Sequence, residues 1–90
     1  MKVIKKPLIV DAWQLDSDEY VDIPDWVFDA MMRRNLSCVK QVNNVARWTV
    51  HTLEGDAISH DGDYLIKGAY GELYPCKKEI FENTYEVLKE

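Results

Sequence analysis

The segment 62–76, GDYLIKGAYGELYPC, gathers the residue types that could do chemistry. It contains three glycines and two carboxylates, namely Gly62, Gly68, Gly71, Asp63 and Glu72. A phosphate-binding loop places such glycines between a strand and a helix N-terminus, usually beside Lys and Ser or Thr. Here each glycine stands between strand-like runs, and no Gly-Lys-Ser/Thr triplet follows. We therefore expect the glycines to adopt backbone conformations in turns that residues with a Cβ avoid. We expect the carboxylates to accept hydrogen bonds from N–H groups of these turns.

Metal binding and nucleophilic catalysis are the other chemistries that these residue types allow. His51, His60 and Cys76 are suitable donors, but their spacing matches no metal-binding pair of the C-x2-C kind. The two lysines after Cys76 would lower its thiol pKa, whereas the Tyr-Pro-Cys sequence is typical of a strand end that packs inward. Cys38 and Cys76 are expected to be reduced core residues. An enzyme that uses Cys76 or His60 ranks last, and we expect no catalytic residue, metal or cofactor.

Length and charge limit the function further. The 90 residues predict a single domain, 1–90, because two cores would leave neither half enough interior. Eleven basic against sixteen acidic residues give a net charge of −5, which argues against direct binding to duplex nucleic acid. The acidity leaves open a chain that imitates nucleic acid or docks on a basic host protein. The apolar runs fall short of the roughly 20 residues that cross a bilayer, and the one near the N-terminus is too short for secretion. We expect no membrane contact and a cytoplasmic location.

Hydrophobic periodicity predicts the elements that position these residues. Residues 23–35, IPDWVFDAMMRRN, have helical spacing, with Pro24 suited to the first helical position and Asn35 to the left-handed residue after the end. The expected inward stripe is Ile23, Val27, Ala30 and Met31. Strands are predicted at 7–15, 36–42, 46–53, 57–58, 64–67, 73–76 and 85–88, with a helical turn or two at 77–83. The expected fold is α+β: a bent antiparallel sheet of about five or six strands, able to curl toward a barrel, with one packed amphipathic helix.

The predicted helix carries more apolar surface than one contact face needs. The partner-binding candidates are Trp26, Phe28, Met32 and Tyr70. Exposed aromatic side chains are enriched at binding hot spots, although a helix covered on two sides by sheet and tail would leave no patch. The ligand-binding candidates of an alternative function are Arg33, Arg34 and Lys67. These side chains could bind phosphate groups while a Trp or Tyr ring stacks on a base, as in a nucleotide-sequestering protein.

Several stretches of the chain together form a family-like pattern: KKPLIVDAWQ at 5–14, IPDWV at 23–27, TLEGD at 52–56 and GDYLIKGAYGELYPCKKEIFENTYE at 62–86. In this pattern the chain resembles the PGDYG family of short bacteriophage and prophage proteins, over nearly its whole length. It departs at His60-Asp61, where the family usually has proline before the Gly-Asp pair. The resemblance implies a phage or prophage origin and expression in a bacterial cytoplasm. It implies no activity and no site residue.

The expected function is a non-enzymatic accessory protein that engages a host or phage macromolecule, for which a host or phage protein is the expected partner. The alternative is a small-ligand binder that sequesters a nucleotide. Because a small sheet has free edges, a homodimer formed through an edge strand or through the helix is compatible with the sequence.

Overall fold

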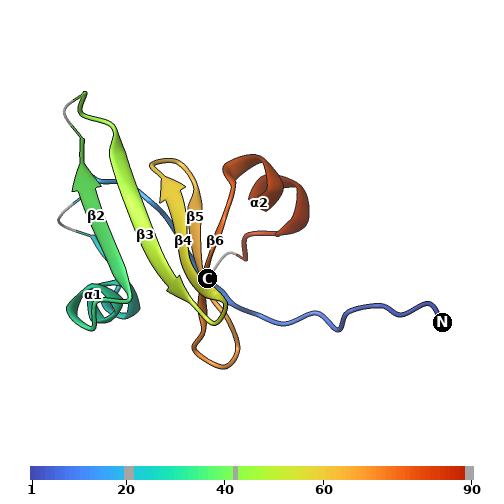
Figure 1. Cartoon of the computed structure of the whole chain (residues 1–90). Helices are drawn as coiled ribbons and strands as arrows, with labels where there is room; N and C mark the ends of the chain where they lie inside the picture. Colours follow the sequence, from blue (N-terminus) through green and yellow to red (C-terminus); the bar gives the residue numbers. More distant parts are fainter. Residues whose placement is uncertain (20–21, 42, 89–90) are drawn as a thin grey trace.

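The computed structural model describes residues 1–19, 22–41 and 43–88. Within these residues the elements are β1 (Asp11–Gln14), α1 (Asp25–Met32), β2 (Leu36–Lys40), β3 (Ala46–Thr52), β4 (Gly55–His60), β5 (Tyr64–Lys67), β6 (Leu73–Cys76) and α2 (Lys78–Thr84). The class is α+β, as expected. The strands form two antiparallel three-stranded sheets, β1-β5-β6 and β2-β3-β4 (Figure 1), so the expected single sheet of five or six strands is not confirmed, and there is no closed barrel in the described chain.

The sheets are separate because the chain changes direction between β4 and β5. His60, the last residue of β4, is paired with Arg47 in one sheet, whereas Tyr64 begins β5 in the other. Between them, the N–H of Gly62 donates to the carbonyl of Leu15 over 2.9 Å. Gly62 has φ +95°, a left-handed conformation that residues with a Cβ rarely adopt, so this glycine meets the sequence-based expectation. Gly71 also has positive φ.

The turn at Gly68 requires glycine for a different reason. Its φ lies outside the left-handed range, so the expectation of a barred backbone conformation is wrong at this position. A Cβ at Gly68 would instead overlap the carboxylate of Glu72, which lies against the backbone there. The N–H of Gly68 donates to the carbonyl of Glu72 over 2.8 Å and closes the turn.

The core lies between the two sheets and α1. Its largest fully buried side chain is Trp48 of β3, which meets Trp13 of β1 edge to face at 5.8 Å between ring centroids. The fully buried aliphatic side chains of the same cluster come from both sheets, the helix and the residue after β1: Leu15, Val27, Leu36, Val50 and Leu65. The expected inward stripe of α1 is confirmed, because Val27 and Ala30 are buried and the other two members pack against the same cluster.

The helix α1 is shorter than the predicted range of 23–35. Pro24 is the residue before the helix and not its first position. At the other end Arg34, with φ +62°, takes the left-handed conformation that was expected at Asn35. The N–H of Arg34 bonds the carbonyl of Met31, and the N–H of Asn35 bonds that of Ala30, which is a Schellman closure. The carbonyl of Asn35 then accepts from His51 over 2.8 Å, which ties the end of α1 to β3.

Both chain ends differ from the prediction. The first strand begins at Asp11 instead of residue 7, because its neighbour β5 ends at the paired residue Lys67. Residues 85–88 form no strand; the chain before them forms α2, where buried Phe81 stacks on Tyr64 at 3.7 Å between ring centroids. The predicted strand 36–42 ends at Lys40, and Val42 lies outside the described residues. In the described chain, no helix has the length and apolar character to cross a membrane.

Candidate functional site

Two large apolar side chains lie exposed on the outer side of α1. Phe28 is 58 % and Met32 69 % accessible, and their spacing of four residues places them one above the other. Two carboxylates on the same helix, Asp25 and Asp29, are exposed as well. Trp26, the third helix candidate, is about 200° around the helix from Phe28 and packs half-buried against the core. The helix candidates therefore divide into an exposed apolar pair, Phe28 and Met32, and the half-buried indole ring of Trp26.

The fourth partner-binding candidate is Tyr70, at the tip of the turn between β5 and β6. It is 94 % accessible, and its N–H donates to a Glu72 carboxylate oxygen over 3.4 Å. Figure 1 shows this turn and α1 at the same end of the molecule. The turn that carries Tyr70 and the helix that carries the apolar pair thus lie at the same end of the domain.

A hollow of about 220 Å³ lies between α1 and the β5–β6 turn. Its lining residues are Trp26, Asp29, Ala30, Arg33, Asn35, Lys67, Gly71 and Leu73. The structure therefore brings the ligand-binding candidates Arg33 and Lys67 together beside an indole ring, and leaves Arg34 outside. Arg33 is paired with Asp29 at 2.9 Å, and both side chains of this pair are mostly exposed. An incoming anion would compete with Asp29 for the guanidinium group.

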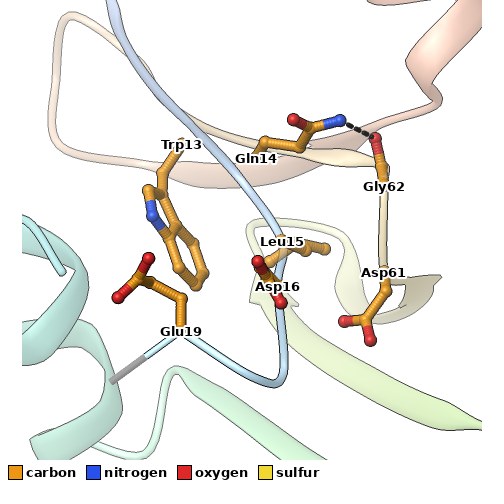
Figure 2. A pocket seen from close by; sticks show the side chains of 7 residues that line it. All are labelled: Trp13, Gln14, Leu15, Asp16, Glu19, Asp61 and Gly62. Atoms are coloured by element: carbon orange, nitrogen blue, oxygen red, sulfur yellow. Dashed lines mark hydrogen bonds between the residues drawn. The ribbon is translucent and has the colours of Figure 1, made fainter. Parts of the chain in front are cut away.

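A second and more acidic hollow, of about 380 Å³, was not foreseen from the sequence (Figure 2). It is lined by Trp13, Gln14, Leu15, Asp16, Glu19, Asp61 and Gly62. Gln14 spans its rim by donating to the carbonyl of Gly62 over 3.0 Å. Three carboxylates and an indole ring at one hollow would favour a cationic group over an anion.

Asp61, on the wall of this acidic hollow, is a structural acceptor. The N–H and Oγ of Ser17 donate to its two carboxylate oxygens at 2.9 and 2.6 Å, and Nε1 of Trp48 donates at 2.7 Å. Burial by itself would raise the pKa of Asp61, but the hydrogen bonds from Ser17 and Trp48, helped by the charge of Lys40, lower it. The carboxylate thus stays charged and satisfies the indole N–H of a core residue.

The carboxylates of the segment 62–76 act as expected from the sequence. Asp63 accepts from Ser59 Oγ at 3.0 Å, from the N–H of His60 at 3.3 Å and from the N–H of Lys78 at 3.2 Å. The last of these bonds fixes the start of α2. Asp63 therefore holds together the end of β4, the corner after it and the second helix, which is a folding role.

The cysteines are both free thiols. Burial raises the pKa of Cys76, and the nearby carboxylate of Asp63 raises it further, so the two following lysines do not activate this thiol. Cys38 is exposed on β2, which corrects the expectation that it is a core residue. Partial burial of its sulfur and the charge of Asp61 raise its pKa against the opposing effect of Lys40. A raised pKa is the reverse of what a catalytic nucleophile needs.

No side-chain hydrogen bond joins either histidine to a cysteine among the described residues. Nδ1 of His51 is 2.9 Å from a carboxylate oxygen of Asp56 across the β3–β4 hairpin, and His60 is exposed at the end of β4. Among the residues that the structure describes, no three His, Cys, Asp or Glu side chains are grouped closely enough to hold a metal ion.

Comparison of the chain with models of protein families, with curated proteins and with solved structures found no match in any of the three.

Proposed function

We propose that this protein is a non-enzymatic binding module that docks on a partner protein through the Phe28–Met32 pair of α1. The observation that carries the proposal is the exposure of these two neighbouring side chains, at 58 % and 69 %, on a helix whose opposite side is buried in the core. The hydrogen bond from the N–H of His51 to the carbonyl of Asn35 ties the end of α1 to β3, and a surface that is held in place before binding loses less entropy on binding.

The charges around the pair define the partner's chemistry. Asp25 and Asp29 lie on the same helix, where Asp29 is paired with Arg33, and the whole chain carries a net charge of −5. A partner with an apolar pocket and a basic group opposite Asp25 would complement both the pair and the acidic chain. The resemblance to PGDYG proteins supports a partner from a phage or its bacterial host, in the bacterial cytoplasm.

The first experiment places a photo-crosslinking amino acid, p-benzoylphenylalanine, at position 28 of the chain expressed in a bacterial host. The matched control carries it at Leu53, which is 86 % accessible in the turn between β3 and β4. We expect a discrete adduct from position 28 that the control does not form and that Met32→Ala weakens. Identical adducts from both positions, or none from position 28, would contradict the proposed surface.

A second candidate function is supported by the hollow beside Trp26. An indole ring, a guanidinium and an ammonium group at one depression suit a ligand with a flat ring and a phosphate, such as a nucleotide. Melting curves in the presence of single nucleotides test it. A saturating rise in melting temperature that is lost in Arg33→Ala/Lys67→Ala and kept in Arg47→Ala would establish the nucleotide binder. Equal shifts in the double variant and the control would place the ligand elsewhere.

A further inference from the structure

The first ten residues form an extended arm that leads into β1 and runs away from the body of the molecule (Figure 1). Its large exposed apolar side chains are Met1, Val3, Ile4, Leu8 and Ile9. None of the strand pairs among the described residues includes this arm. The cause is the length of β5, which ends at Lys67, opposite Asp11, and then turns back. The arm is thus a strand-like segment without a strand partner among the described residues of its own copy.

The arm and the rest of the chain have opposite charge. Three of the eleven basic residues and none of the sixteen acidic ones lie in positions 1–10, which leaves eight basic and sixteen acidic residues in positions 11–90. The arm therefore carries a charge of +3 and the remainder −8. Charges of opposite sign attract the arm of one copy to the body of another and steer their encounter.

The free edge of β1 offers the arm a matching row of backbone groups. The N–H and carbonyl of Leu15 both bond toward β5, to Asp63 and Gly62 at 2.8 and 2.9 Å. Because alternate residues of a strand direct these groups to opposite sides, Ala12 directs its own to the free edge. The same alternation, continued into the arm, turns Leu8 to the free edge and the nitrogen of Pro7 away from it. Proline is tolerated in a strand only where its missing donor faces away from the partner.

We propose that two copies of the chain pair antiparallel through β1 and the arm, about a two-fold axis at Leu8. In this register Leu8 lies opposite Leu8 of the second copy, and Lys5 lies opposite Asp11. Each interface thus contains the Lys5–Asp11 pair twice, because the arrangement is symmetric. Val3, 81 % accessible in the single copy, comes to lie opposite the half-buried Trp13.

The register explains three features of the arm together. The exposed aliphatic side chains gain cross-strand neighbours, and Lys5 meets Asp11 of the other copy. The nitrogen of Pro7, which has no hydrogen to donate, faces away from the partner strand. The joined edges also remove a free strand from each sheet, which is the usual route by which an edge is protected. The inference stands apart from the proposed function, since the Phe28–Met32 pair takes no part in it.

Sedimentation velocity of the full chain over a range of concentrations tests the pairing. We expect a concentration-dependent dimer whose dissociation constant rises about tenfold or more in Lys5→Asp, where like charges face each other, and in Leu8→Asp. The triple variant Lys5→Asp/Asp11→Lys/Lys67→Asp restores opposite charges across the interface and also against residue 67, which pairs with residue 11 in the same copy, and is expected to recover the dimer. Val87→Asp, at an exposed apolar residue outside the arm, is the control and should leave the dimer unchanged.

The other outcomes contradict the proposal. A wild-type chain that stays monomeric at every concentration would overturn it, as would a dimer that Leu8→Asp leaves intact. Recovery that fails in the charge-swapped variant would refute the register. Far-ultraviolet circular dichroism accompanies each variant, and because Lys5 and Leu8 lie outside the packed core, we expect unchanged spectra.

Discussion

Replacing Asp61 by alanine removes the acceptor that links three parts of the chain. Trp48 is 2 % accessible and its indole N–H donates to Asp61 at 2.7 Å, so the alanine variant leaves a buried donor unpaired. An unpaired buried donor costs about 1–3 kcal/mol, and the lost bonds from Ser17 at the surface add about 1 kcal/mol. We therefore expect Asp61→Ala to lower the free energy of unfolding by roughly 2–4 kcal/mol, out of a total of about 5–15 kcal/mol for a domain of this size.

The assay is urea denaturation followed by tryptophan fluorescence and circular dichroism, with Asp61→Asn as the matched variant. Asparagine keeps an oxygen for Trp48 but no charge, so we expect it to lose about 1 kcal/mol. Because the folded-state pKa of Asp61 is lowered below the ordinary 3.8, the charge stabilises the fold above that pH. The stability difference between wild type and Asp61→Asn should therefore shrink as the pH falls below 3.8.

The reasoning about Asp61 is refuted by either of two results. A loss smaller than about 0.5 kcal/mol in the alanine variant, the size of an ordinary surface substitution, would show that Trp48 finds another acceptor. A difference between wild type and Asp61→Asn that grows as the solution is acidified would show that the charge does not stabilise the folded state.

Other substitutions test the remaining structural assignments. Phe81→Ala, which removes the ring stacked on Tyr64, should cost about 3 kcal/mol in urea denaturation, and a loss under about 1 kcal/mol would mean that α2 is not docked as described. A Cβ added in Gly62→Ala would have no atom within 4 Å, so backbone strain alone should lower the stability by about 1–2 kcal/mol in melting experiments. An unchanged melting temperature would argue against the φ of +95° at this residue. Burial and Asp63 raise the pKa of Cys76, so the pH midpoint of its alkylation by iodoacetamide should lie above that of a cysteine peptide. A lower midpoint would show that Cys76 is a reactive thiol.

Local features of the fold could be predicted from the sequence because local chemistry determines them. The strands 64–67 and 73–76 have the predicted bounds, since turn-forming glycines lie before both strands and after the first. The buried side of α1 follows from its period. The division into two sheets could not be predicted, because periodicity marks a strand without naming its neighbour. The pairing of β1 with β5 joins residues about fifty positions apart. Asp61, in the corner between the sheets, accepts a hydrogen bond from Trp48 that no sequence motif indicates.

The candidate site was predictable only in part, for related reasons. Residues two positions apart in a helix lie about 200° apart around its axis. Helical geometry alone therefore places Trp26 and Phe28 on different sides of α1, and this could be predicted from the sequence. The meeting of Arg33 with Lys67 is different. It depends on the β5–β6 turn lying beside α1, which is a tertiary arrangement. The acidic hollow likewise arises from residues of β1, the loop after it and the corner before β5.

The most direct test of the central claim, that the Phe28–Met32 pair is a docking surface, is calorimetric titration of the crosslinked partner once it is purified. We expect Phe28→Ala/Met32→Ala to raise the dissociation constant about thirtyfold, as removal of a hot spot of about 2 kcal/mol requires, while Leu53→Ala leaves it unchanged. A dissociation constant that is the same in wild type and the double variant would contradict the claim.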